Sequence, residues 1–368
     1  MRVVFIDPIP WDYNVRTPLE QPLGGSQSAL CYLSMQLAAD GWDITLVNNT
    51  SAPGVYTGVR CVDRATGLTP EVLEAADVIV VSNHAMGRTL RGAVGARARM
   101  VLWSGHATNG PEVSPLRDPV ERAAWDAFAL VSRWQAGEYV ASFGIEPSRI
   151  AILRNAVAPA FEIQYPRKAW FESGKPPVLA YTTTPYRGLE VLRVAFPRIR
   201  ASVPGARLKI FSGMKVYQVP DDKDPHRKLY RRCAAIPGVE HIGNISQVEL
   251  AEAMSDVDIL AYPSIFAETS CISVMEAMAA GCLVVASSLA ALPETMAGHG
   301  TVVPLVDEPG RFATAYANVV VSVIAGACND PAAMVAKLDK QVGFARSTYT
   351  WKARADEWRT FLSRLVAR

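Results

Sequence analysis

The stretches RVVFID (residues 2–7) and DITLV (43–47) flank a helical pattern that begins at Gly24-Gly25-Ser26 and ends at Gly41. Both stretches are apolar on both faces, which is typical of buried parallel strands rather than of alternating antiparallel ones. A strand, a helix and a second strand in this order make one βαβ unit. These residues therefore predict that the chain begins a doubly wound α/β sheet.

The same alternation continues along the chain. Further strands are predicted at residues 78–81, 100–103, 127–131, 150–153, 178–181, 207–211, 257–261 and 283–286. Between the two halves, residues 161–177 are rich in Pro, Lys and polar residues, as expected of an interdomain connection. We therefore predict an α/β protein with two Rossmann-like domains, residues 1–164 and 165–349, whose sheets face a central cleft.

Composition narrows the class of protein. The chain has 368 residues, of which 50% are hydrophobic and 20% charged, which excludes a disordered or collagen-like protein. Lys and Arg outnumber Asp and Glu by only 37 to 35, so no overall field favours nucleic acid. Asp7 follows the first apolar residues so soon that this apolar run is too short for a signal peptide. We also expect no uncharged apolar run that approaches the roughly 18 residues of a membrane span. A cytoplasmic location is expected.

Neither cysteines nor acids predict a metal site. The six cysteines are scattered singly without a CxxC pair, so they are interpreted as reduced core thiols. Asp256 and Asp258 imitate a D-x-D metal motif, but they enter a buried strand, where such acids are structural. No metal is expected.

The most informative stretch for chemistry is YPSIFAETSCISVMEAMAAG (residues 262–281). We expect a strand, a loop that carries Glu268, and a helix that Thr269 or Ser270 caps and Gly281 ends. The unpaired N–H groups of such a helix start suit an anion or a hydroxyl group. Glu276 lies roughly 9 Å along the helix axis, so the two carboxylates can address separate parts of a hydroxyl-rich ligand. An ordinary pKa of about 4.3 would keep Glu276 ionised without special tuning.

In this context Glu268 and Glu276 resemble the E-x7-E signature of the retaining glycosyltransferases of the GT-B fold, family 4 (glycosyl transferases group 1). The resemblance extends over nearly the whole chain, through Gly24-Gly25, LRNAV (153–157), RGLE (187–190), HIGNI (241–245) and GCLVVA (281–286). A lone E-x7-E is a weak signal, but the whole set in this order is specific. The resemblance implies the GT-B fold, an acceptor-binding first domain, and a final helix (350–368) that returns to that domain.

The resemblance also implies an activity, the transfer of a sugar from a nucleotide sugar to a hydroxyl group of a saccharide, glycolipid or polysaccharide precursor. Glu276 would hold the ribose hydroxyls, and Glu268 with the amides of Ser270 and Cys271 would hold the transferred sugar. Arg187 would stabilise the departing diphosphate, and His106, with His84 as its rival, would contact the sugar. The remaining donor-binding residues would be Gly24, Gly25, Thr183, Lys215, Ile245 and Ile272.

The chain departs from the family pattern at one place. The family usually has a second basic residue before the pair that Arg187-Gly188 matches, where this chain has Thr182-Thr183-Thr184. A threonine of this stretch or Lys215 could replace the second basic residue. The absence of that residue favours a catalytically silent nucleotide-sugar-binding protein as the rival interpretation. A sugar-nucleotide epimerase or a phosphorylase of the same fold is also compatible with these residues. A dinucleotide oxidoreductase is disfavoured because Gly24-Gly25 lacks the third glycine of GxGxxG.

Stereochemistry and partners follow from the same residues. Inversion needs a general base beside the acceptor hydroxyl, and the first domain shows no histidine with an evident orienting acid, so we expect retention with the departing phosphate as base. The expected partners are a nucleotide sugar and a saccharide or lipid-linked acceptor. A basic cluster allows peripheral contact with an anionic membrane, although a solvated face is the commoner role of such residues: Arg88, Arg91, Arg97 and Arg99.

Overall fold

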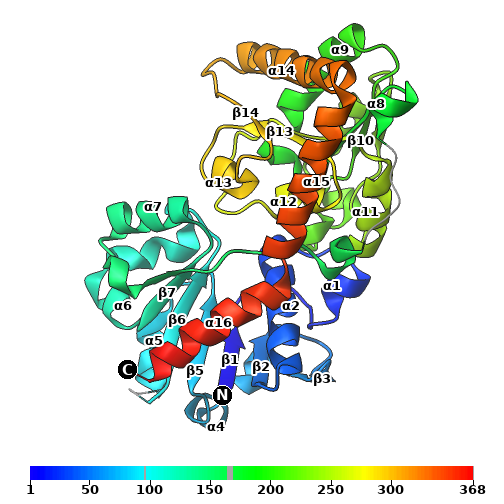
Figure 1. Ribbon diagram of the computed structural model, residues 1–368. Helices are drawn as coiled ribbons and strands as arrows, with labels where there is room; N and C mark the ends of the chain where they lie inside the picture. The colour runs from blue at the N-terminus through cyan, green and yellow to red at the C-terminus, as the bar shows by residue number, and fades with distance from the viewer. Residues whose placement is uncertain (95–96, 164–168, 368) are drawn as a thin grey trace. The chain divides into compact units, whose positions relative to one another are not determined.

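The computed structural model describes residues 1–94, 97–163 and 169–367. The chain divides into two compact units, the first made of Met1–Glu20, Gly24–Ala156 and Trp351–Arg368, the second of Gln21–Leu23 and Val157–Thr350. The domain boundary predicted between residues 164 and 165 lies outside the described residues. Each unit has its own sheet, coloured blue to cyan in the first and green to yellow in the second (Figure 1).

The first unit is built on an eight-stranded sheet with the order β3-β4-β2-β1-β5-β6-β7-β8. Every neighbouring pair is parallel except β3 with β4, which is antiparallel. The short strands β3 and β4 were not predicted. The strands are β1 (Arg2–Ile6), β2 (Asp43–Asn48), β3 (Gly54–Tyr56), β4 (Val59–Asp63), β5 (Val78–Ser82), β6 (Arg99–Ser104), β7 (Ala127–Leu130) and β8 (Ile150–Ile152).

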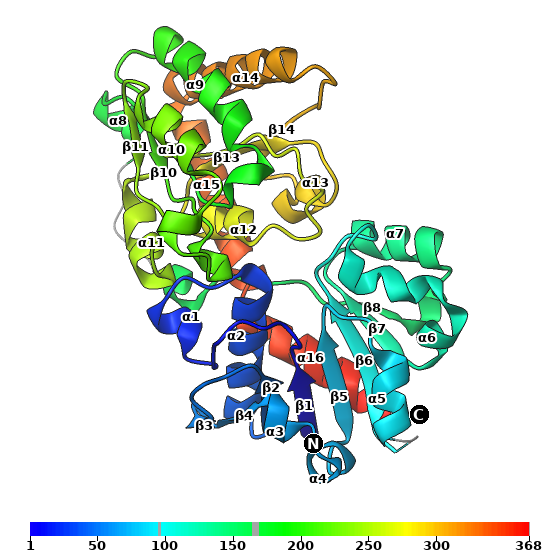
Figure 2. The same ribbon diagram turned by 180° about the vertical axis from the view of Figure 1, so that it is seen from behind.

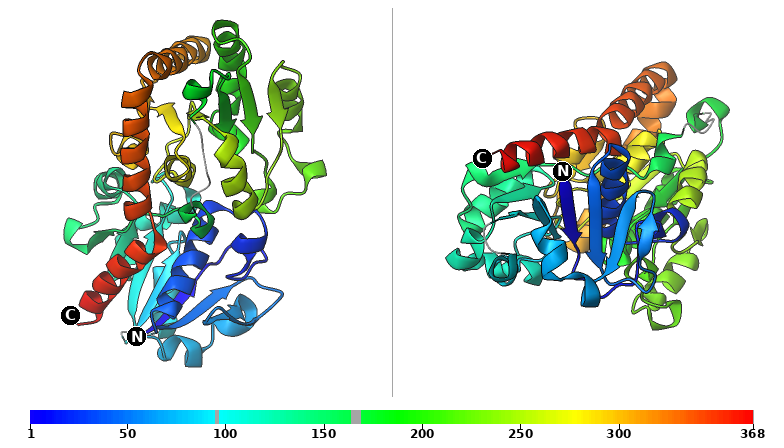
Figure 3. Two further views of the ribbon diagram at one scale, coloured as in Figure 1. Left: turned by 45° about the vertical axis from the view of Figure 1, so that its right-hand side comes forward. Right: turned by 90° about the horizontal axis from the view of Figure 1, so that it is seen from below.

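Helices cover both faces of this sheet (Figures 2 and 3). Alternate strand residues such as Ile6 and Leu102 join a buried cluster with Leu90 and Tyr139 from the helices on one face. On the other face Trp358 of α16 packs edge-on against Phe5 and Trp103. The helices are α1 (Thr17–Glu20), α2 (Gly25–Ala39), α3 (Arg64–Gly67), α4 (Pro70–Glu74), α5 (Gly87–Val94), α6 (Pro119–Ala123), α7 (Arg133–Phe143) and α16 (Trp351–Val366).

The second unit has a six-stranded, wholly parallel sheet with the order β11-β10-β9-β12-β13-β14. Its strands are β9 (Val178–Tyr181), β10 (Arg207–Ile210), β11 (Val239–His241), β12 (Ile259–Tyr262), β13 (Leu283–Ser287) and β14 (Thr301–Val303). Its helices are α8 (Trp170–Ser173), α9 (Leu189–Ser202), α10 (Arg227–Ala234), α11 (Gln247–Ala253), α12 (Ile272–Ala279), α13 (Leu292–Met296), α14 (Pro309–Asn329) and α15 (Pro331–Thr348). The two doubly wound sheets confirm the predicted fold class.

Strand order identifies the edge at which each sheet binds ligands. In an open α/β sheet this is the carboxyl edge at the point where the strand order reverses. The reversal lies between β1 and β5 in the first sheet and between β9 and β12 in the second. The loops after β9 and β12 carry Arg187 and Glu268, so the sequence places both residues at the switch point.

Helix α14 corrects one expectation about membranes. Residues 312–329 carry no charged side chain, and α14 is long and apolar enough to cross a membrane by length and composition, the one such helix in the described chain. In the structure α14 lies along α9, and the hydroxyl of Tyr316 donates to the carbonyl of Val285 in the second sheet, 2.7 Å away. One face of α14, which includes Phe312 and Ile324, is therefore buried in this unit, and 39% of the apolar window is buried.

The two acids of the D-x-D sequence have different surroundings. Asp258 is buried, and its carboxylate accepts a 2.8 Å hydrogen bond from the backbone N–H of Val178 at the start of β9. Asp256 is exposed at the end of a 3₁₀ turn. The pair therefore gives no common metal-binding geometry, and Asp258 joins β12 to β9.

We expect Asp258→Ala to lower the free energy of unfolding by about 1–3 kcal/mol, because it leaves a buried backbone donor without its acceptor. Asp256→Ala is the matched control and should change that free energy by less than about 0.5 kcal/mol. Urea unfolding of both variants measures the difference. Equal stabilities would contradict the structural role of Asp258.

Candidate functional site

The loops after β9 and β12 are held together by backbone contacts. Gly188 has φ +145° and lies so close to the backbone of Pro263 that a Cβ would collide with its carbonyl oxygen. The N–H of Ile265 donates to the carbonyl of Arg187 across 3.0 Å. Only glycine fits here, which explains the glycine that follows Arg187 in the sequence.

Arg187 and Glu268 form an ion pair at this switch point, in which Glu268 is buried and Arg187 is half-buried. The guanidinium Nη1 donates to Oε1 of Glu268, the same oxygen that accepts the hydroxyl of Tyr262, and Nε donates to Oγ1 of Thr184 over 2.9 Å. Glu268 is 5% exposed. Burial by itself would lower the pKa of Arg187, but the charge of Glu268 raises it well above the usual value. The guanidinium is therefore charged and fixed in place.

Aromatic rings surround this cation. The guanidinium carbon of Arg187 lies 4.5 Å from the ring centre of Phe266 and 5.6 Å from that of Tyr186. The hydroxyl of Tyr186 is 3.2 Å from that of Tyr217. These contacts add cation–π stabilisation and restrict the rotamers of Arg187.

The candidates for the missing basic residue lie in different positions. Thr184 is buried and holds Arg187, whereas Thr183 is half-buried on the same loop. Lys215 is exposed, and its backbone N–H donates to Oδ1 of Asn244 across 3.1 Å. The same amide oxygen lies where a Cβ on Gly213 would stand, so Asn244 ties the loop of Lys215 to the segment that carries Ile245.

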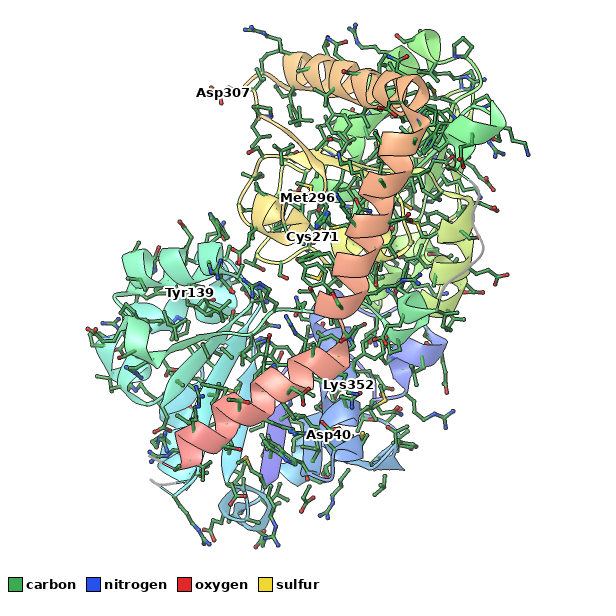
Figure 4. All side chains as sticks on the ribbon, viewed as in Figure 1. Asp40, Tyr139, Cys271, Met296, Asp307 and Lys352 are labelled. Atoms are coloured by element: carbon green, nitrogen blue, oxygen red, sulfur yellow. The ribbon has the colours of Figure 1, made fainter. Side chains whose placement is uncertain are left out.

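Helix α12 begins one residue later than predicted. Its N-cap is Cys271, whose side chain makes no capping bond, so the expected cap by Thr269 or Ser270 was wrong. Cys271 lies buried at the helix start (Figure 4). The hydroxyl oxygen of Ser270 is buried and has no hydrogen-bond partner among the described residues. The backbone N–H groups of Ile272 and its neighbours form the first turn, where an anion or hydroxyl can bind.

Glu276 in the middle of α12 is buried, with 5% of its surface exposed. Its carboxyl group receives a hydrogen bond from the backbone of Ala158, but Oε1 has no hydrogen-bond partner in the described part of the chain. Burial raises the pKa of Glu276 to about 8, and the bond from Ala158 offsets only part of this effect. The expectation of an ordinary, ionised carboxylate was therefore wrong.

In the first unit, the loops after β1 and β5 lie at the switch point. Gly24 is the buried N-cap of α2, and Gly25 is the exposed first residue of this helix, as predicted. Asp7, which sequence reasoning did not single out, is fully buried and accepts the hydroxyl of Tyr13 over 2.6 Å and the amide of Gln27 over 3.0 Å. An acid directly after a strand of apolar residues was the signal that could have identified it.

His106 follows β6 in the same unit. Its ring nitrogen Nδ1 lies 3.6 Å from Oε2 of Glu112, a residue that sequence reasoning missed. An acid therefore lies near a histidine at this edge, which the sequence analysis did not anticipate. His84, the rival candidate, has Nδ1 3.3 Å from the carbonyl oxygen of Ser82.

Three of the four arginines of the basic cluster have acidic partners. Arg88 pairs with Asp118 at 3.0 Å, and Arg91 and Arg99 share Asp126 at 2.6 and 3.3 Å. Arg97 is exposed. The two carboxylates compensate two of the four positive charges. Residues 95–96 next to Arg97 lie outside the description.

The structure thus brings Arg187 and Glu268 into contact and places Thr183, Ser270, Cys271, Ile272 and Glu276 on the same loops and helix of the second unit. The loop of Lys215 contacts the segment that carries Ile245 through the hydrogen bond from the N–H of Lys215 to Asn244. Gly24, Gly25 and His106 belong to the first unit. Among the residues that the structure describes, no group of three or more His, Cys, Asp or Glu side chains could hold a metal ion, and every cysteine there is free.

Two comparisons of the sequence with known proteins identify similar proteins. Residues 177–324 match the family model "Glycosyl transferases group 1". Phosphatidyl-myo-inositol mannosyltransferase from Mycolicibacterium smegmatis is 30% identical over 188 residues, which cover 50% of this chain and 45% of the relative. The chain therefore matches about half the length of that curated relative.

Solved structures match over the whole chain. Sucrose-phosphate synthase from Thermosynechococcus elongatus has a TM-score of 0.72 at 17% identity, and each chain is covered to 100%. The Anabaena protein HepE, solved in complex with UDP, has a TM-score of 0.71 at 15% identity, with 99% of this chain and 100% of that chain covered. At these identities the likeness shows the fold, which is GT-B, with two Rossmann-like domains. Arg187, Glu268 and Glu276 lie within the segment that matches the family model "Glycosyl transferases group 1".

The raised pKa of Glu276 makes a prediction about stability. Below about pH 4.5 the carboxyl is protonated in both the folded and the unfolded protein, so it makes no pH-dependent contribution to stability. Between about pH 4.5 and 8 the folded protein holds the proton more tightly than the unfolded chain does. The free energy of unfolding of the wild type therefore falls as pH rises through this range. Glu276→Gln removes this loss. We expect the unfolding free energies of the two proteins to diverge with rising pH, by about 1.4 kcal/mol for each unit of pKa shift.

Urea unfolding at a series of pH values measures this divergence. Val248→Ala, which shortens an exposed side chain of α11 in the same unit and removes no titratable group, is the control and should run parallel to the wild type. A difference between Glu276→Gln and the wild type that does not depend on pH would contradict a raised pKa of Glu276.

Proposed function

We propose that the chain is an enzyme that transfers a sugar from a nucleotide-sugar donor to a hydroxyl group of an acceptor, with the nucleotide held by the second unit. The observation that carries this proposal is Glu276, a buried carboxyl with an unpartnered oxygen in the helix that starts at the switch point. A group of this kind costs stability, and a polar ligand offsets the cost.

A ribose fits the surroundings of Glu276. Its two neighbouring hydroxyls can donate to one carboxylate, and hydrogen bonds to an ionised acceptor are about twice as strong as neutral ones. Binding of the hydroxyls then favours the ionised form of Glu276, whose pKa in the free protein is raised by burial. We propose that the ribose supplies the partner that Oε1 lacks.

Arg187 supplies positive charge for the diphosphate. Its guanidinium has five N–H donors, and the bonds to Glu268 and Thr184 use two of them. Because Glu268 fixes the cation before the donor binds, little reorganisation is needed when charge develops on the leaving phosphate. We propose that Glu268 also accepts hydroxyls of the transferred sugar, and that the first-turn amides of α12 with Ser270, Cys271 and Ile272 complete this subsite.

The comparisons support a sugar donor of this class. The curated relative is a mannosyltransferase by name, and the similar Anabaena protein binds UDP. We propose a saccharide or lipid-linked acceptor, a metal-independent reaction, and retention of configuration as in family 4. We further propose that His106 acts on the transferred sugar and that the amides of Gly24 and Gly25, with Thr183, Lys215 and Ile245, act on the nucleotide.

Removal of the Arg187 cation tests the diphosphate assignment. We expect Arg187→Ala to weaken nucleoside diphosphate binding by about 10- to 100-fold, the loss of one charged hydrogen-bonding group. Calorimetric titration with UDP and with GDP in the presence of EDTA measures this change and tests the metal-independence of binding. Arg198→Ala, an exposed arginine on α9, is the control.

Because Arg187→Ala leaves Glu268 buried without its cation, Arg187→Lys is titrated as well. It keeps the charge and should lose less affinity than Arg187→Ala. Unchanged affinity in a folded Arg187→Ala protein, or binding that disappears in EDTA and returns with magnesium, would contradict the assignment.

The product identifies the reaction. Incubation with the nucleotide sugar alone should leave it unchanged, because transfer needs an acceptor, whereas an epimerase would convert it and a binding protein would do nothing even with acceptor. With acceptor we expect NMR of the first-formed glycoside to show the anomeric configuration of the donor. An inverted anomer would overturn retention and assign His106 with Glu112 as a general base.

A further inference from the structure

His106 is held rigidly at the carboxyl edge of the first sheet. Its backbone N–H donates to Oγ of Ser104 over 3.1 Å, and its carbonyl accepts bonds from the side chains of Gln135 (2.9 Å) and Tyr139 (3.0 Å). Tyr139 projects from α7 (Figure 4). These bonds fix the backbone of His106. What orients the ring therefore decides which nitrogen it presents.

Glu112 is fixed beside that ring. It lies in a 3₁₀ helix, Pro111–Arg117, and its carbonyl accepts the N–H of Ala85 over 2.9 Å, which joins this turn to the loop after β5. Gly110 packs against both side chains, since a Cβ there would lie 3.3 Å from Oε2 of Glu112 and from Nδ1 of His106. Glycine at 110 leaves room for the two groups to face one another.

Oε2 of Glu112 is buried and has no hydrogen-bond partner among the described residues. The polar atom that faces it is Nδ1 of His106 at 3.6 Å, slightly longer than a hydrogen bond. A buried carboxylate oxygen without a donor costs free energy, and a small rotation of the imidazole removes that cost. Hydrogen bonds in a free enzyme are often long and shorten when substrate binds.

We propose that Glu112 is the positioning residue of His106. Its carboxylate accepts the Nδ1 proton and so fixes the tautomer in which Nε2 is a hydrogen-bond acceptor. In a neutral imidazole one nitrogen donates and the other accepts, so the partner of Nδ1 determines what Nε2 can bind. The identity of the ligand at Nε2, a hydroxyl group of the transferred sugar, rests on the proposed function. The orientation of the His106 ring by Glu112 does not depend on the proposed function.

The tautomer can be measured on the free protein without any donor. The ¹⁵N chemical shifts of the two ring nitrogens report which one carries the proton, at a pH above the titration of the histidine. We expect His106 in the wild type to carry the proton on Nδ1. In Glu112→Ala, which removes the acceptor, the proton should move to Nε2. Glu112→Gln keeps an oxygen acceptor without the charge and should keep the proton on Nδ1.

Kinetics provide the second measurement. If the protein transfers sugar as proposed, Glu112→Ala should lower kcat by between about ten- and a hundredfold, the cost of a misplaced group near the reacting atoms. KM for the donor should change little, because the nucleotide is held elsewhere. Glu112→Gln should rescue most of kcat. Glu74→Ala, an exposed glutamate of the same unit, is the control.

Several results would overturn the proposal. A wild-type His106 with its proton on Nε2, or a tautomer that is the same in Glu112→Ala, would show that Glu112 does not orient the ring. A failure of Glu112→Gln to restore kcat, with an unchanged unfolding midpoint, would also contradict it. If no donor supports transfer, the proposed function fails while the tautomer measurement still decides the role of Glu112.

Discussion

Two buried glutamates follow β12 in the second unit, and they differ in their partners. Glu268 is paired with Arg187, so its charge is compensated, whereas burial raises the pKa of Glu276 to about 8, and Oε1 of Glu276 has no hydrogen-bond partner in the described part of the chain. A protein retains a destabilising group of this kind mainly where it is used. The chemistry proposed for this unit depends on this difference.

Backbone packing makes the arrangement possible. The close approach of Gly188 to Pro263 and the bond from Ile265 to Arg187 bring the loops after β9 and β12 together. Without this approach Arg187 could not reach Glu268, and the carboxylate would be a buried charge without compensation. The same site therefore constrains a glycine, an arginine and an acid at once, which is why these residues form a recognisable sequence pattern.

Sequence alone predicted the parts of the site that depend on local order. Parallel strands, the turn at Gly24, and the acids in the stretch from Tyr262 to Gly281 follow from periodicity and spacing. The pKa of Glu276, in contrast, depends on burial against a distant segment at Ala158, which no local pattern encodes. Sequence analysis did not identify Asp7 and Glu112 for a related reason. Gln27, which donates to Asp7, lies in α2, and His106, which lies 3.6 Å from Glu112, follows β6. The start of α12 at Cys271 was missed because capping preference favours Ser or Thr and the structure uses neither.

Proton release on donor binding tests most directly whether Glu276 holds the ribose. In the free protein at neutral pH the raised pKa keeps this carboxyl largely protonated, and hydrogen bonds donated by the two ribose hydroxyls favour its ionised form. Titration calorimetry with a nucleotide sugar, in buffers of different ionisation enthalpy, counts the protons exchanged. The account predicts release of nearly one proton per nucleotide sugar bound by the wild type, and none by Glu276→Gln. Binding by the wild type without proton release would contradict it.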